Sequence, residues 1–307
     1  MTTRFAYLGL IIIWGTTPLA IKWSTEGVGY LFGITGRMVL GLVVTYLIIL
    51  ILGRRMPWHR RAVQTYLAGG LGIYAAMTSV YWGSQFIPSG WVSVVFGLSP
   101  IITGALASVL LEEDALSLHK VLGIALGFLG LVIVFGHGFA LGPEFLYGVL
   151  AVLAGTSFHA LSSVLIKRLD ANLRGFAITA GGLSFAVPLF LITWWLNGGT
   201  FPTEIPTRAA MSILYLGIIA SAIGFALYYF VLRQMSVSRV SLIALITPIF
   251  ALALGNLLNS EPLSAAILLG TVCIVSGLLF YEYGALLIAG LRGSSVATPV
   301  ISTSIED

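Results

Sequence analysis

Apolar runs long enough to cross a lipid bilayer follow one another along almost the entire chain. A membrane-spanning helix needs about 20 mostly apolar residues, and we count ten runs of this kind. They cover residues 5–22, 30–52, 64–86, 89–111, 118–136, 143–166, 175–197, 208–231, 239–258 and 264–286. Because the bilayer core offers no water to exposed backbone groups, such runs fold as helices. The sequence therefore predicts an all-α membrane protein with ten transmembrane helices.

The composition leaves no room for a soluble domain. Of the 307 residues, 58% are hydrophobic and 8% are charged, whereas a soluble domain carries roughly a quarter charged residues. The longest polar segment is 291–307, which we expect to be a disordered cytoplasmic tail. The single Cys273 excludes a disulfide within the chain, and no metal or cofactor motif is found. We therefore expect no cofactor.

The basic residues indicate which ends of the runs face the cytoplasm. With the N-terminus inside, only Lys22 and Arg208 fall in outside segments. The inside segments hold twelve basic residues: Arg4, Arg54, Arg55, Arg60, Arg61, Lys120, Lys167, Arg168, Arg174, Arg233, Arg239 and Arg292. This partition predicts a bacterial inner (plasma) membrane protein with both termini in the cytoplasm. Since the cations sit at the ends of apolar runs, the net charge of +4 does not indicate a nucleic-acid partner.

Two stretches of the chain repeat one pattern. Pro100 and Pro248 occupy the same position in it, as do Glu113 and Glu261, and the members of each pair are 148 residues apart. Ten spans then divide into two sets of five, and because five is odd the two sets cross the membrane in opposite directions. We expect a first five-helix repeat over 1–139 and a second, inverted repeat over 140–290.

These features resemble the drug/metabolite transporter superfamily in its ten-span EamA-type branch. The matching residues are Trp14-Gly15 in the first run, Arg37 in the second, both prolines, and the two glutamates, each followed by a glycine-containing run that includes Gly123 and Gly127 or Gly270. The resemblance implies a carrier that exports amino acids, related metabolites or drugs. Among bacterial members the chain is similar to aromatic amino-acid exporters, although no residue fixes that choice. The second half lacks counterparts of Trp14 and Arg37, which predicts an asymmetric binding site.

The repeated prolines are candidate hinges. Pro100 and Pro248 each lie about halfway along a run, and each leaves the carbonyl four residues earlier, that of Phe96 or Ala244, without its helical partner. At this depth such groups need a partner in the protein or in a wet cavity. Because the proline recurs in the other half, we expect both sites to bend during transport.

Ionisable residues inside a membrane are costly and are candidates for function. Arg37 lies about 10 Å in from the outer surface, at 1.5 Å per residue, and could attract a carboxylate or bind the backbone of a neighbouring helix. The resemblance favours the structural role. His159 could relay protons, bind substrate or be an ordinary core histidine. All eleven carboxylates lie at the ends of runs, in loops or in the tail. The absence of a carboxylate at mid-membrane favours a facilitator driven by the substrate gradient.

A polar and aromatic stripe occupies one face of the third run, because its members are three or four residues apart. It comprises Tyr74, Thr78, Tyr81, Trp82 and Gln85. Such side chains would lose hydrogen bonds against lipid, so we expect them to face a substrate pathway, with an interfacial belt as the alternative for Trp82 and Gln85. The expected pathway also includes Thr16, Thr17, His159, Ser163 and Tyr228.

Three other functions compete with a facilitative amino-acid exporter. A proton-coupled multidrug or amine exporter would use His159, the remaining titratable candidate. A membrane-embedded enzyme would need a nucleophile elbow, a zinc motif or a Walker loop, and the sequence contains none of these. A channel would need charged rings or a carbonyl filter. We therefore expect a non-enzymatic carrier whose partners are a small-molecule substrate and the lipid bilayer. We expect a monomer, with the seam Gly123-x-x-x-Gly127 packing helices within it.

Overall fold

The structure is a computed structural model that describes residues 3–111, 118–138, 144–241, 243–261 and 263–291. The described residues form helices and no strand, which confirms the all-α prediction. The helices are α1 (Thr3–Trp23), α2 (Tyr30–Ile51), α3 (Arg60–Gly83), α4 (Ser89–Phe96), α5 (Ser99–Leu110), α6 (Leu118–Gly138), α7 (Glu144–Leu169), α8 (Gly175–Leu196), α9 (Thr207–Tyr215), the π-helix η2 (Leu216–Ile223), α10 (Gly224–Gln234), α11 (Val237–Ser241), α12 (Ile243–Asn259) and α13 (Ala265–Leu291). Glu113 and the tail after Leu291 lie outside the described residues.

Several helices are long and apolar enough to cross a membrane, so the chain is an integral multi-pass membrane protein. In the described ranges six segments meet this condition: Thr3–Trp23, Tyr30–Ile51, Ser89–Leu110, Glu144–Leu169, Gly175–Leu196 and Thr207–Gln234. Shorter apolar helices cover Leu118–Gly127, Phe250–Asn259 and Ala265–Tyr281. The count of ten spans and the inversion of the two halves stay predictions, to which we return below.

The helix containing the first repeated proline is broken just before that proline. α4 ends at Phe96 and α5 begins at Ser99, which places Pro100 in the first turn of α5. Proline is well tolerated there because the first turn of a helix lacks a backbone acceptor for its amide groups. The sequence alone placed the disturbance at the proline, whereas the structure places it at Gly97 and Leu98.

The second repeated proline is accommodated differently. Pro248 lies inside α12, which continues from Ile243 to Asn259. The hydroxyl of Thr247 donates to the carbonyl of Ala244 at 3.3 Å, the same carbonyl that loses its amide partner to the proline. A side chain therefore replaces part of the missing backbone bond, and the two matched prolines have different local structures.

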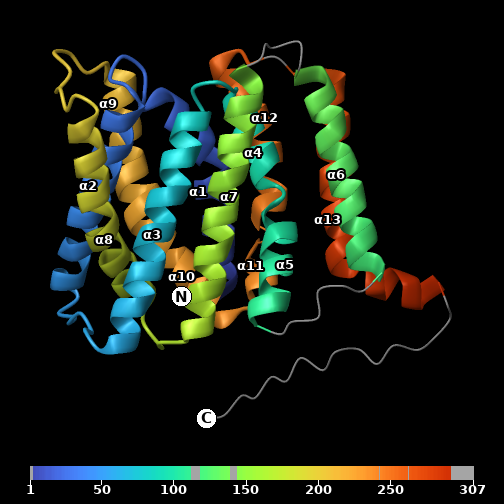
Figure 1. Ribbon diagram of the computed structural model, residues 1–307, viewed down its shortest axis with the longest axis horizontal. Helices are drawn as coiled ribbons and strands as arrows, with labels where there is room; N and C mark the ends of the chain where they lie inside the picture. The colour runs from blue at the N-terminus through green and yellow to red at the C-terminus, as the bar shows by residue number, and fades with distance from the viewer. Residues whose placement is uncertain (1–2, 112–117, 139–143, 242, 262, 292–307) are drawn as a thin grey trace.

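The helices form one bundle with an outlying pair (Figure 1). α2, α8 and α9 lie at one side, α6 and α13 at the other, and α1, α4, α7, α10 and α12 lie between them. Glycines hold the outlying pair together. A Cβ added at Gly123 would meet the carbonyl oxygen of Gly277 at 2.5 Å, and one at Gly277 would meet the amide nitrogen of Gly127 at 2.6 Å. The seam predicted from Gly123 and Gly127 thus packs α6 on α13 within the chain.

Basic residues separate between the two ends of the bundle. The segments between α2 and α3 and between α7 and α8, which hold Arg54, Arg55 and Arg174, lie at the lower end in Figure 1. The upper end holds the end of α1, with Lys22, and the start of α9, with Arg208. α1 begins and α13 ends toward the lower end.

The glycine seam makes a prediction about stability. Replacing Gly277 by valine should lower the thermal unfolding midpoint in detergent, because the added carbons collide with the backbone of α6. Overpacking of this kind costs about 1–3 kcal/mol. The matched control is Ser276→Val, which changes the neighbouring exposed position of α13. Equal midpoints for the two variants would contradict the seam.

Candidate functional site

A cavity lies between the central helices. Its volume is about 90 Å³, and since one buried water needs roughly 10–15 Å³ of such space, it has room for several. α1, α2, α3, α4, α5, α7, α10, α11 and α12 all contribute to its wall. The lining side chains with polar atoms are Trp14, Thr17, Arg37, Ser93, Ser99, His159, Tyr228, Ser241 and Thr247.

The two repeated stretches of sequence line this same cavity at equivalent positions. Val92, Ser93, Phe96 and Ser99 contribute from α4 and α5, and Val240, Ser241, Ala244 and Thr247 contribute from α11 and α12. Each residue of the first set is 148 positions before its counterpart in the second, the separation that also relates Pro100 to Pro248. Hydroxyl groups recur at two of the four matched pairs. The repeat is therefore a property of the cavity wall as well as of the sequence.

Aromatic rings form one part of the wall. The ring of His159 contacts Trp14 at 5.7 Å, Tyr228 at 5.1 Å and Phe96 at 6.4 Å between centroids, in edge-on geometry. Trp14 and Tyr228 are also in contact, at 4.9 Å. Such pairs favour edge-on packing because the positive ring edge meets the negative face. They give the cavity a stiff apolar surface.

Ser163 supports this aromatic wall from behind. Its Oγ lies 2.6 Å from the hydroxyl oxygen of Tyr228 and donates to the backbone carbonyl of His159 at 2.8 Å. One hydroxyl thus links two of the aromatic residues and fixes the position of the Tyr228 ring.

Arg37 forms a charged part of the wall. It is 2% exposed, its Nε donates to Ser221 Oγ at 2.9 Å, and its Nη1 has no hydrogen-bond partner. Among the described residues, the ion pair found joins Arg208 to Glu26 at 3.6 Å and does not involve Arg37. The guanidinium carbon lies 6.0 Å from the centroid of the Tyr81 ring, at the outer limit of a cation–π contact.

A close helix approach positions Arg37. One turn later on α2, a Cβ at Gly41 would meet the Cβ of Ser221 at 2.8 Å. Glycine therefore lets the π-helix η2 come near enough for Ser221 to reach the guanidinium. π-helical segments are often found at functional sites, and no sequence pattern predicted this one.

The structure brings some of the predicted pathway residues to the cavity and leaves others away from it. Thr17, Arg37, His159 and Tyr228 line it, and Ser163 stands directly behind. Thr16 is directed to Tyr215, with their hydroxyl oxygens 2.5 Å apart. Sequence reasoning missed the lining residues Trp14, Ser93, Phe96, Ser99 and Thr247 as site residues, although all lie in the motifs that carry the repeat or the family resemblance.

The residues of the predicted stripe on α3 contact different parts of the protein and do not share one site. The hydroxyl of Tyr74 lies 2.6 Å from Thr193 Oγ1 of α8, and the hydroxyl of Tyr81 accepts from Ser24 at 3.3 Å. Trp82 is 39% exposed and packs on Phe86, while the exposed Gln85 bonds back to the Tyr81 carbonyl. Because one face of a long helix meets different helices at different heights, equal spacing does not imply one shared cavity. α3 lines the cavity through Met77 and Val80 instead.

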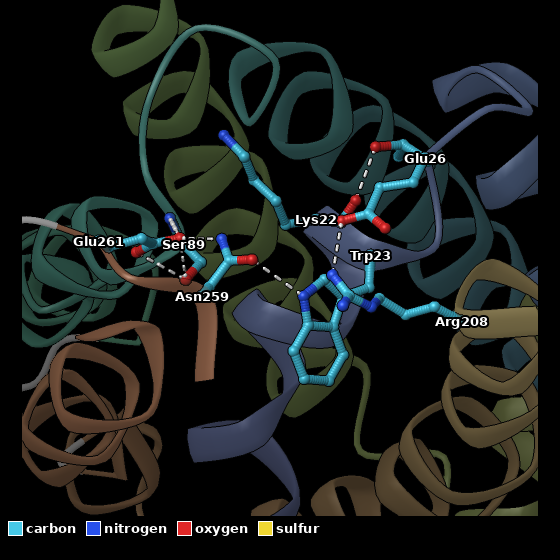
Figure 2. Close-up of polar contacts among 8 residues, drawn as sticks. Lys22, Trp23, Glu26, Ser89, Arg208, Asn259 and Glu261 are labelled. Atoms are coloured by element: carbon cyan, nitrogen blue, oxygen red, sulfur yellow. Dashed lines mark hydrogen bonds and ion pairs between the residues drawn. The ribbon is translucent and has the colours of Figure 1, made fainter. Parts of the chain in front are cut away.

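A polar network joins the helices at the upper end of the bundle (Figure 2). The carboxylate of Glu261 accepts hydrogen bonds from the amides of Ser89 and Gly90, at 3.0 and 3.2 Å, and from Ser89 Oγ at 2.8 and 2.9 Å. It also accepts from Asn259 Nδ2 at 3.0 Å, and Asn259 Oδ1 accepts from Trp23 Nε1 at 3.1 Å. The network therefore connects α12, α4 and α1.

Side chains of opposite charge hydrogen-bond the backbone at the two ends of the loop between α3 and α4. Glu261 binds the free amides at the start of α4, and Lys22 Nζ donates to the carbonyls of Ser84 and Ile87 at 3.2 and 3.0 Å. These signs match the helix dipoles, which favour an anion at a helix start and a cation at a helix end. Gly255 makes room for the carboxylate, since a Cβ there would meet Glu261 Oε2 at 2.5 Å.

Comparison with known proteins gives a consistent result. The model of the EamA-like transporter family matches residues 3–136 and 146–283. The "Uncharacterized transporter YoaV" of Bacillus subtilis is 26% identical over 284 residues, which cover 90% of this chain and 96% of the relative. A "Probable terminal-alkyne amino-acid exporter" of Streptantibioticus cattleyicolor is 25% identical over 276 residues, covering 88% and 89%. A solved structure described as "Crystal structure of protein" superposes with a TM-score of 0.70 at 20% identity, covering 92% of this chain and 98% of that one, which shows a shared fold.

The upper network makes a testable prediction. Glu261→Gln should lower the unfolding midpoint in detergent. The carboxylate is charged and has two acceptor oxygens, whereas the amide is neutral and has one. Hydrogen bonds to charged groups contribute about 1.5–3 kcal/mol. Glu204→Gln, at an exposed carboxylate, is the control and should have little effect. In a Ser89→Ala background the loss caused by Glu261→Gln should shrink, and full additivity of the two changes would contradict the contact.

Proposed function

The chain belongs to the EamA-like transporter family, and from that premise we propose that it is a secondary carrier that exports small organic metabolites, with amino acids as the substrate class. Members of the family are membrane transporters rather than enzymes. The observation that carries the proposal is the cavity between the central helices, which has aromatic rings on one part of its wall and unpaired hydrogen-bond donors on another. A relative named as an amino-acid exporter supports the substrate class.

We propose ten spans in two inverted five-helix halves, 1–139 and 140–290, in a bacterial inner membrane with both termini cytoplasmic. Three observations support this arrangement. Residues 148 positions apart line one cavity from both halves. The two segments of the family match lie on either side of the expected boundary. α1 begins and α13 ends toward the same end of the bundle, where basic residues gather.

The proposed mechanism is alternating access, in which the cavity opens to one side of the membrane at a time. The upper end is held together by the contacts of Glu261 and Lys22, so this structure fits a state closed at that end. The break at Gly97 and Leu98, before Pro100, and the weakened turn at Pro248 are the proposed bending points. Bending there would move the cavity-lining residues of α4, α5 and α12 relative to the rest.

We propose that transport is facilitative. Among the described carboxylates none lines the cavity, so a titrating acid of the kind that couples many carriers to protons is lacking there. His159 is the alternative coupling site. A proton-coupled exporter of amines or drugs is the second candidate function, and the unneutralised charge of Arg37 disfavours it because like charges repel in a cavity of low dielectric constant.

Transport in proteoliposomes tests the coupling. With an amino acid that the protein carries, counterflow should proceed without a pH gradient, and a pH gradient alone should not concentrate the substrate. Replacing His159 with glutamine should leave the response to pH unchanged. Accumulation against a gradient that is driven by pH and is lost in His159→Gln would replace the facilitator by the proton-coupled exporter.

A reporter enzyme that is active only outside the cytoplasm tests the topology. Fused to the C-terminus it should give no signal, because the twelve inside cations hold that end in the cytoplasm. Inserted after Gly199, in the segment between α8 and α9, it should be active. The reverse pattern would exclude the proposed orientation.

A further inference from the structure

Buried polar atoms that lack a hydrogen-bond partner indicate what the cavity binds. In the described part of the chain, three buried side-chain nitrogen or oxygen atoms have no hydrogen-bond partner: Arg37 Nη1, Thr78 Oγ1 and Ser93 Oγ. They come from α2, α3 and α4. Arg37 and Ser93 line the cavity, whereas Thr78 is not part of its wall. Buried polar groups are normally paired, so two unpaired ones on the wall of a single cavity indicate a ligand that binds there.

Arg37 is the costliest of the three to leave unpaired. Its guanidinium is charged at any physiological pH, it is 2% exposed, and no described carboxylate pairs with it. Ser221 uses the Nε donor alone, and the ring of Tyr81 at 6.0 Å offers weak compensation. A buried charge without a counterion destabilises a protein. An anion in the cavity would remove this penalty.

From these contacts we propose that Arg37 binds the carboxylate of the transported molecule, with the hydroxyl of Ser93 as an additional donor. The guanidinium presents its donors in a planar fork that matches the two oxygens of a carboxylate. This inference rests on the proposed carrier function and narrows its substrate class.

The opposite part of the wall specifies the rest of the molecule. Trp14, Phe96, His159 and Tyr228 offer ring faces and edges, which suit an apolar or aromatic group. The substrate class is therefore a small monocarboxylate with an apolar or aromatic side chain. A free α-amino group is compatible with the site, because the hydroxyl of Ser93 can accept a hydrogen bond as well as donate one. The guanidinium of Arg37 has no acceptor and therefore recognises the carboxylate and not the amine.

Three related compounds separate the carboxylate from the amine. L-phenylalanine has both groups, 3-phenylpropionate lacks the amine, and phenethylamine lacks the carboxylate. Equilibrium binding of radiolabelled L-phenylalanine to the purified full-length protein, with displacement by the other two, measures each contribution. We expect displacement by 3-phenylpropionate and at least tenfold weaker displacement by phenethylamine.

Variants of Arg37 locate the preference. Arg37→Met should weaken the binding of L-phenylalanine and 3-phenylpropionate at least tenfold. It should also raise the unfolding midpoint of the ligand-free protein, since it removes a buried charge without a counterion. Arg37→Lys keeps the charge but loses the planar fork of donors, so its affinity for the two acids should lie between those of the wild-type protein and Arg37→Met. Thr45→Ala is the control: its hydroxyl bonds the Gly41 carbonyl on the same helix, it is not part of the cavity wall, and the variant should retain the preference for carboxylates.

Each contrary outcome has a separate meaning. If Arg37→Met unfolds at a lower temperature and keeps the preference for carboxylates, Arg37 has a structural role and the inference is wrong. If the wild-type protein binds phenethylamine in preference to both acids, the carboxylate site is wrong while a carrier of amines stands. If none of the three compounds binds, the inferred site for a carboxylate with an aromatic side chain is wrong, while the proposed carrier function is still decided by the transport assay described above.

Discussion

Polar groups inside this bundle must find partners within the protein, because the surrounding hydrocarbon offers none. Most do so locally: the hydroxyls of Thr17, Thr45 and Thr156 bond the carbonyl four residues earlier on their own helices. The interruptions of the helices need longer connections. Glu261, two residues after the end of α12, supplies the acceptors for the free amides that begin α4. Pairing the free amides of one helix thus connects two parts of the chain that are far apart in sequence.

At the cavity, some buried polar groups have no hydrogen-bond partner. Ser93 and Arg37 keep unpaired donors there, while Tyr228 and Ser163 a short distance away are fully bonded to each other. The same broken helix that requires Glu261 at its start brings Ser93, Phe96 and Ser99 to the cavity wall. The start of α4 is therefore held by Glu261, while the cavity wall is formed by its later residues and the start of α5. In the proposed mechanism, bending at Gly97 and Leu98 would change the cavity without disturbing the start of α4.

The sequence predicted the helices better than the directions of their side chains. Apolar length and the positions of Gly123 and Gly127 sufficed for the all-helical bundle and for one helix seam, since both follow from local composition. Tyr74 and Trp82 could not be assigned from spacing, because their surroundings depend on which helices pack against α3 at each height. The π-helix beside Arg37, which packs closely on α2 at Gly41, left no sequence signal. Trp14 and Ser93 were visible as motif residues, yet their role at the cavity required the fold.

If the two halves are inverted repeats, as proposed above, they differ in charge, and the packing of the second half accounts for the difference. In that arrangement the counterpart of α2 is α8, which contains glycine and no arginine and packs closely on α3. A Cβ at Gly70 would meet the carbonyl of Gly182 at 2.6 Å. A long basic side chain at this contact would force α3 and α8 apart. The cavity consequently has a single charged region, on the side of α2, and an aromatic region built by α1, α7 and α10. In a carrier of the proposed kind, this polarity would hold a carboxylate at one end of the cavity, so that the apolar part of the substrate always faces the aromatic rings.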